Sequence, residues 1–279
     1  MGVLERALEH QANGETFVLA TVVRTVSVTA AKAGAKALIG PDGSIEEGWI
    51  GGGCARAAVV KAARQCMLDG QSRLVSIAPK DALAELGAAA GEERGGVFFA
   101  KNSCPSQGTM DVFVEPIMPK PRLLILGASP VAVALARLAP MFGFAVTVAA
   151  QPADLDRFGG EPERHEGLAP PPSAGNGAFV VISTQGAGDR AALKAVAAMP
   201  ARYRAFVGSR RKGETLKREL ADEGVAAESL AGVKAPAGLD ISAITSEEIA
   251  LSIIAEMTAV RRGPERPDAP SGSSRGAGP

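Results

Sequence analysis

Apolar residues follow two patterns along this chain: short unbroken runs, and stretches with helical spacing. In the N-terminal part the runs predict buried strands, and the helical spacing predicts two helices, the second of which stops at Gly70. Pro41-Asp42-Gly43 predicts a turn that joins two of the strands into a hairpin. The predicted strands cover residues 17–23, 36–39, 44–50, 74–77, 97–99 and 110–115, and the predicted helices cover residues 3–11 and 55–68.

The pattern becomes regular beyond residue 121, where apolar runs alternate with helical stretches. Alternation at this spacing predicts an open, doubly wound parallel sheet. The last helix begins with a capping box, Thr245-x-x-Glu248. Strands are predicted at 123–126, 145–149, 179–183 and 205–207, and helices at 131–142, 189–199, 214–223 and 245–262.

Prolines at 116, 119 and 121 predict a linker between two domains. We therefore expect an α/β protein with a mixed α/β domain over residues 1–117 and a Rossmann-like domain over 121–262. Residues 263–279 are rich in Gly, Pro and Ser without apolar periodicity, which predicts a disordered tail.

Composition and charge exclude several classes of protein. Among 279 residues, 30 Lys and Arg balance 30 Asp and Glu, which argues against a nucleic-acid-binding protein. Two His, and three Cys without a C-x-x-C spacing, argue against a His-rich metal site and a disulfide framework. No signal peptide and no apolar run of about 20 residues is present, so we expect a cytoplasmic protein without a membrane span, with reduced thiols.

The first chemistry-bearing segment is Gly51-Gly52-Gly53-Cys54, between a predicted strand and a predicted helix. N–H groups at a helix start favour an anion, and glycines let a ligand reach the backbone. A thiol there is driven toward the thiolate, and Arg56 would strengthen both effects. This pattern favours a phosphate-bearing ligand beside a reactive sulfur; a tight turn with a structural cysteine is the alternative.

The other two cysteines differ in setting. Cys104 lies in a polar, Pro- and Gly-containing segment, residues 101–109, which predicts an exposed loop thiol that is either functional or an ordinary loop residue. Cys66 lies in the middle of a predicted helix, and we interpret it as a core residue.

The Rossmann-like part carries an altered glycine fingerprint, Gly127-x-Ser129-x-x-Ala132. Ser129 replaces the glycine that lets a pyrophosphate approach, and no acidic residue follows the second strand before Asp154. Ordinary NAD binding is therefore not expected.

A basic cluster follows the fourth strand of this part, at Gly208-Ser209-Arg210-Arg211-Lys212. Ligands of doubly wound sheets bind at the carboxyl ends of the strands, where this cluster is expected together with residues 184–186 and Asp189. It is interpreted as a phosphate site or, alternatively, as a solvated group of charges.

Taken together, these motifs resemble one family, the XdhC/CoxI molybdoenzyme accessory proteins. The Ser103-Cys104-Pro105-Ser106 variant resembles the branch that serves aerobic carbon monoxide dehydrogenase (CoxF-like). The chain departs from the general family at Ser129, at Ala150, where Asp is frequent, and at Gln185, where His is frequent. The resemblance rests on the order and spacing of residues 18–25, 50–54, 111–116, 127–132, 208–212, 236–241 and 247–256.

The resemblance implies a maturation factor rather than an enzyme, with no catalytic residue assigned. Such a protein binds molybdenum cofactor transiently, supports its sulfuration and inserts it into a xanthine dehydrogenase- or carbon monoxide dehydrogenase-type molybdoenzyme. Its expected partners are the molybdoenzyme large subunit, a cysteine desulfurase-type sulfur donor and a second copy in a homodimer. The alternatives are an NAD(P)-binding oxidoreductase and a cofactor-free scaffold between sulfurtransferase and molybdoenzyme.

Residues and resemblance together define the expected site. Cys54 and Cys104 are expected to contact the metal or its sulfur. The residues expected to hold the cofactor are Gly51, Gly52, Gly53, Cys54, Arg56, Cys104, Gly127, Ser129, Gly208, Ser209, Arg210, Arg211 and Lys212.

Overall fold

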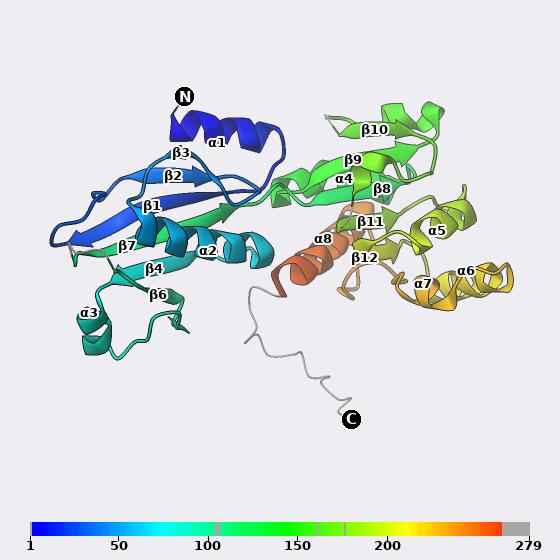
Figure 1. The fold of residues 1–279 in the computed structure, drawn as a ribbon. Helices are drawn as coiled ribbons and strands as arrows, with labels where there is room; N and C mark the ends of the chain where they lie inside the picture. The colour runs from blue at the N-terminus through cyan, green and yellow to red at the C-terminus, as the bar shows by residue number, and fades with distance from the viewer. Residues whose placement is uncertain (1, 104–106, 161, 176, 264–279) are drawn as a thin grey trace. The chain divides into compact units, whose positions relative to one another are not determined.

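The computed structural model describes residues 2–103, 107–160, 162–175 and 177–263 (Figure 1). The chain divides into two compact units, Met1–Pro119 and Lys120–Pro279. Residues 264–279 of the predicted disordered tail, and Cys104, lie outside the described residues. Within the described part, no helix has both the length and the apolar character needed to cross a membrane.

The first unit is built on a seven-stranded mixed sheet in the order β3-β2-β1-β7-β4-β6-β5. Its neighbouring strands are antiparallel except for β4 and β6. The predicted hairpin is present as β2 and β3. The strands are β1 (Phe17–Val26), β2 (Lys36–Ile39), β3 (Ile45–Gly48), β4 (Arg73–Ala78), β5 (Glu93–Arg94), β6 (Val97–Lys101) and β7 (Thr109–Ile117).

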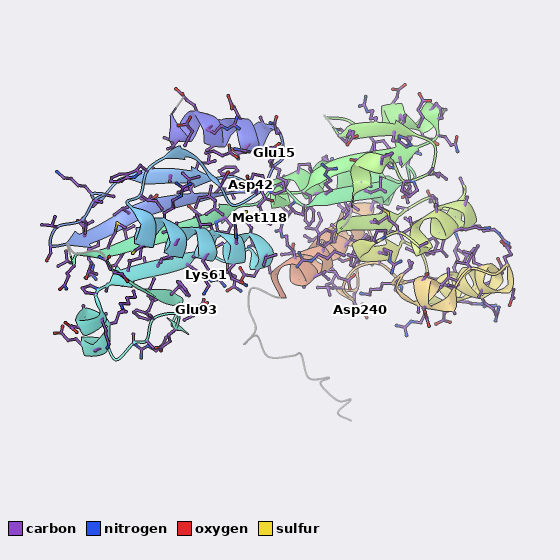
Figure 2. The ribbon with its side chains drawn as sticks, viewed as in Figure 1. Glu15, Asp42, Lys61, Glu93, Met118 and Asp240 are labelled. Atoms are coloured by element: carbon purple, nitrogen blue, oxygen red, sulfur yellow. The ribbon has the colours of Figure 1, made fainter. Side chains whose placement is uncertain are left out.

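Helix α2 (Gly53–Asp69) covers one face of this sheet (Figure 1). Its buried residues pack against alternate strand residues, such as Val18 and Val112, and they include Cys66, which is a core residue as the sequence predicts. Lys61 extends from α2 to 5.2 Å from the ring centroid of Phe98 on β6 (Figure 2). On the other face, α1 (Val3–Ala12) packs near β2, and α3 (Lys80–Glu85) packs near β6.

The second unit confirms the predicted doubly wound parallel sheet, in the order β10-β9-β8-β11-β12. Helices α4 (Pro130–Leu138) and α8 (Ser246–Arg262) pack on one face, and α5 (Asp189–Ala197), α6 (Arg210–Asp222) and α7 (Ala227–Ala231) on the other. Its strands are β8 (Arg122–Leu126), β9 (Ala145–Ala150), β10 (Glu163–Glu166), β11 (Ala178–Ile182) and β12 (Ala201–Phe206).

Several elements differ from the sequence prediction. Strand β10 was not predicted because its residues are Glu, Arg, His and Glu, which leave no apolar run on this edge strand. Helix α6 begins at Arg210 instead of residue 214, so the basic cluster forms its first turn. Between β9 and β10 the chain forms a 3-10 helix, η2 (Pro152–Arg157), in place of the usual crossover α-helix. Two further 3-10 helices are η1 (Ala139–Phe142) and η3 (Pro172–Ala174).

A buried carboxylate, Glu256 on α8, ties together three segments of the second unit. It accepts hydrogen bonds from the Tyr203 hydroxyl at 2.5 Å and from the Gly238 N–H at 2.9 Å, and it pairs with the Lys234 ammonium. At Gly238, a side chain would lie 2.2 Å from the Ser252 hydroxyl oxygen. One carboxylate thus joins β12, the segment around Gly238 and α8.

We predict that Glu256→Gln destabilises the second unit by about 1–3 kcal/mol, because the amide leaves a buried partner unpaired. Glu247→Gln is the control, since Glu247 on the same helix is 59% exposed and forms only a 3.6 Å pair with Arg137. Urea unfolding followed by the near-ultraviolet signal of Tyr203, the single tyrosine of the chain, measures both variants. Equal midpoints for the two variants would contradict the role of Glu256.

Alkaline pH provides a second test of the same network. Burial, and next the hydrogen bond to Glu256, raise the pKa of Tyr203 far above its ordinary value of 10.0. Because the pKa is raised, the folded protein disfavours the tyrosinate form of Tyr203. The contribution of neutral Tyr203 to the stability of the folded protein is therefore complete below pH 10.0 and is lost as the pH rises further. We expect tyrosinate absorbance to appear only together with loss of ellipticity, whereas the urea-unfolded chain titrates normally. Titration near the ordinary value in a folded chain would contradict this account.

Candidate functional site

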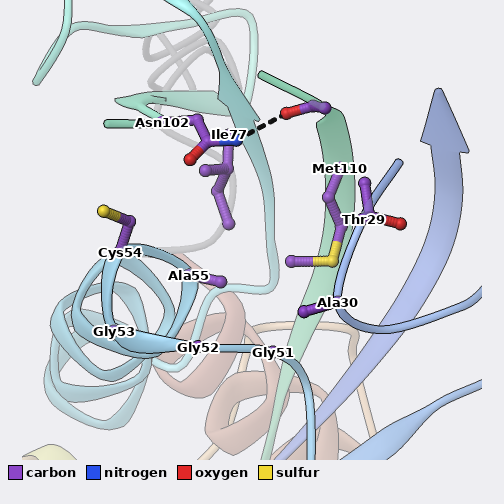
Figure 3. Close-up of a pocket in the computed structure, with 11 residues that line it drawn as sticks. Thr29, Ala30, Gly51, Gly52, Gly53, Cys54, Ala55, Ile77, Asn102 and Met110 are labelled. Carbon is purple, nitrogen blue, oxygen red and sulfur yellow. Dashed lines mark hydrogen bonds between the residues drawn. The ribbon is translucent and has the colours of Figure 1, made fainter. Parts of the chain in front are cut away.

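The first unit contains a cavity of about 260 Å³ beside the start of α2 (Figure 3). Its walls are formed by the loop after β1, the turn from β3 into α2, the chain between β6 and β7, and strands β4 and β7. The lining residues are Thr29, Ala30, Gly51, Gly52, Gly53, Cys54, Ala55, Ile77, Asn102, Gly108 and Met110.

The three glycines of this turn are present for different reasons. Gly51 has φ +117°, a backbone conformation that L side chains rarely adopt. Gly52 has an ordinary φ of −79°, and a Cβ on Gly52 or Gly53 would meet nothing within 4 Å. Neither backbone conformation nor packing requires glycine at these two positions, so their effect is to leave the main chain open toward the cavity.

The open main chain is also the start of a helix. Gly52 is the N-cap of α2, and no side chain caps the helix there. The first N–H groups of an α-helix have no intrahelical partners and carry partial positive charge. The cavity wall therefore presents uncapped N–H donors, which are suited to a negatively charged or strongly polar group.

Cys54 is the second residue of α2, and its free, partly exposed thiol lines the same cavity. Asn102 lies across the cavity from it, and its amide N–H donates to the Gly108 carbonyl oxygen at 2.6 Å (Figure 3). The Met110 thioether and the Ile77 side chain make that side of the cavity apolar (Figure 3). The site thus combines helix N–H donors, a thiol and an amide over an apolar surface.

The other residues predicted for this part of the site lie elsewhere. Arg56 is exposed on α2 and is not among the residues that line the cavity. Cys104 lies between Asn102 and Gly108 in the chain, outside the described residues, so its predicted contact with the metal or its sulfur, alongside Cys54, stays a prediction. Among the described residues, no three His, Cys, Asp or Glu side chains gather as a metal site.

A second cavity, of about 220 Å³, lies in the second unit at the carboxyl ends of β8, β9 and β11, and Gly127 and Ser129 line it. Gly127 has φ +98°, and a Cβ there would lie 2.6 Å from the Ser183 carbonyl oxygen. The Ser129 hydroxyl accepts from the Ala132 N–H and lies 2.6 Å from the Ser183 hydroxyl, and the Ser129 N–H donates to the Ser183 carbonyl. The polar groups of this turn therefore form hydrogen bonds with groups of the protein itself. In a typical dinucleotide-binding fingerprint, the corresponding groups stay available to bind the pyrophosphate.

The basic cluster also has local roles in the second unit. The Ser209 hydroxyl caps α6 by accepting from the Lys212 N–H at 3.3 Å, and Gly208 packs against the Phe206 ring. The Lys212 ammonium pairs with the Asp189 carboxylate. Lys212 therefore already has an ion-pair partner within the protein, whereas Arg210 and Arg211 are exposed in the first turn of α6.

Asp189 connects this cluster to the end of β11. Its carboxylate also accepts from the Thr184 hydroxyl and from the Gly186 N–H at 2.9 Å. Burial by itself would raise the pKa of Asp189, but the Lys212 pair and these hydrogen bonds lower it below the ordinary range. The basic cluster therefore helps to hold the rim of the Rossmann sheet together.

Sequence reasoning did not single out several residues of the first cavity: Thr29, Ala30, Ile77 and Met110. Each lies in an apolar or loop segment with no motif of its own. The strand pairing brings them together, since β4 and β7 are adjacent and the loop after β1 meets the start of β7. No local pattern marks such residues in a single sequence.

Comparisons with known proteins agree with this architecture. Residues 123–257 match the XdhC Rossmann domain, and residues 10–78 match the XdhC and CoxI family. An Escherichia coli K12 protein, Uncharacterized protein YqeB, is 31% identical over 304 residues, which cover 100% of this chain and 51% of YqeB. The chain therefore spans about half the length of this curated relative.

A crystal structure from Bacillus halodurans, described as a xanthine dehydrogenase, is 20% identical and covers 97% of this chain and 98% of that one. The TM-score between the two structures is 0.46. The two family matches cover most of both units. The chain is therefore similar to the XdhC and CoxI family over residues 10–78 in the first unit and to the XdhC Rossmann domain over residues 123–257 in the second.

Proposed function

We propose that this protein is a molybdoenzyme maturation factor that binds molybdenum cofactor in the cavity beside α2. XdhC family membership suggests a role in molybdoenzyme maturation. The observation that carries the specific proposal is the open Gly52-Gly53 main chain next to the Cys54 thiol. Neither glycine is required by the fold, so ligand access is the remaining physical reason for them.

The residues of the cavity fit such a cofactor. When bound, it supplies a phosphate and a sulfur-ligated molybdenum. The uncapped N–H groups of α2 bind the phosphate, as helix N-termini commonly do. Cys54 offers a soft thiolate for the metal or its sulfur, and Cys104 is proposed as the second thiol.

The size of the cavity limits what it encloses. Small-molecule sites generally measure about 300–1,000 Å³, so a cavity of about 260 Å³ takes only part of a large cofactor. The apolar surface of Ile77 and Met110 excludes water from the enclosed part. A partly enclosed cofactor suits transient holding and transfer, in which the exposed part stays accessible to a client.

The finer assignments belong to the same proposal. The client is proposed to be a xanthine dehydrogenase- or carbon monoxide dehydrogenase-type large subunit, with the chain in the CoxF-like branch. Sulfuration is proposed to depend on a cysteine desulfurase-type donor, and the protein is proposed to act in the cytoplasm without catalysing a reaction. The internal bonding of Ser129 supports the expectation that the Rossmann unit does not use NAD(P).

We predict that Cys54→Ser lowers the molybdopterin content of the protein about 10-fold or more after co-expression with cofactor biosynthesis, because the change removes the thiolate that is proposed to contact the metal or its sulfur. Cys54→Ser together with Cys104→Ser should abolish it. Fluorescence of the oxidised pterin released from purified protein measures the content. Ala57→Ser is the matched control, since Ala57 is exposed on the same helix and is not among the cavity-lining residues.

Two results would overturn the proposal. One is unchanged pterin content in the double-cysteine variant. The other is saturable NAD(P)H binding by calorimetry with no pterin in any preparation, which would favour an oxidoreductase.

A further inference from the structure

The short crossover between β9 and β10 leaves a groove on the second unit. A crossover in a doubly wound sheet is normally an α-helix that covers the sheet face. Here η2 has six residues, and the face beside α4 retains a groove of about 970 Å³. Its floor is apolar and includes Val133, Phe144, Val146 and Phe158. The groove therefore lies where a helix would normally pack.

The rim of this groove is predominantly basic. Lys120, Arg122 and Arg137 line it, and Glu163 is the acidic residue among the described lining residues. Arg137 pairs with Glu247 at 3.6 Å, and both side chains are more than half exposed. An exposed ion pair of this kind contributes little to stability, so Arg137 can exchange it for another partner. An occupant with an apolar stripe and outward acidic groups would complement this surface.

Helix α1 has these properties. Leu4 and Leu8 are 63% and 66% exposed and lie one turn apart, so they form one stripe along the helix. Among the described α-helices, α1 is the one with two leucines exposed to this degree. Its basic residues are engaged within the same chain, because Arg6 and His10 both bind Glu46, whereas Glu5 is exposed and accepts only from the Gly2 N–H at the helix start among the bonds described.

We propose that α1 of one copy docks in this groove of a second copy, so that the protein self-associates through the two surfaces. Leu4 and Leu8 pack on the apolar floor, and Glu5 faces the basic rim. A helix of ten residues is about 15 Å long and about 10 Å wide, so it suits a groove left by a single missing helix. This contact is independent of the cofactor cavity, because neither surface includes a residue that lines it.

Sedimentation velocity over a range of concentrations tests the proposal. We expect the unaltered protein to associate, and Leu4→Glu with Leu8→Glu to weaken association about 100-fold or more, because two buried leucines are lost. Ala145→Trp should weaken it as well by filling the groove, since Ala145 is an exposed lining residue. Leu68→Glu is the control: Leu68, on α2, is 82% exposed and should have no effect.

Mixing the two defective variants gives a decisive result. The Ala145→Trp chain keeps an intact α1 and the double-glutamate chain keeps an intact groove, so the mixture should associate more strongly than either variant alone. Circular dichroism confirms that each variant is folded. A monomeric unaltered protein, association unaffected by the double-glutamate change, or a mixture no stronger than its components would each overturn the proposal.

Discussion

The start of helix α2 is the constraint around which the first unit is organised. The chain leaves β3, turns through Gly51 in a conformation that favours glycine, and enters the helix with no side-chain cap. An uncapped helix start is energetically tolerable only where water or a ligand reaches its N–H groups. The cavity supplies that access, and the sheet positions Ile77, Asn102 and Met110 around it.

In the Rossmann unit, helices α4 and α6 begin with side-chain caps, unlike α2. The turn into α4 is capped by Ser129, which also bonds to Ser183 at the end of the neighbouring strand. The turn into α6 is capped by Ser209, and Lys212 is paired with Asp189. In this unit the strand ends that usually bind a dinucleotide are joined to one another. The same type of strand–turn–helix element is thus open in one unit and closed in the other.

A buried polar network links distant segments of the second unit. Glu256 joins α8 to Tyr203 and to the segment around Gly238, so one buried carboxylate fixes elements far apart in the sequence. The face beside α4 remains uncovered where η2 replaces a helix. A sheet face with an apolar floor and a charged rim is a common basis for association between chains.

The sequence by itself determined the fold class, most strands and the capping box at Thr245, because these depend on local periodicity and on residues at fixed spacing. It also identified the glycine turn with Cys54. Only the tertiary structure decided which glycines serve packing, since a Cβ on Gly127 would meet the backbone of Ser183 and Thr184 whereas one on Gly52 or Gly53 would meet nothing. It likewise decided that Lys212 is paired, that β10 exists and that a groove lies beside α4. These properties arise from contacts between segments distant in the chain, which no local pattern of residues encodes.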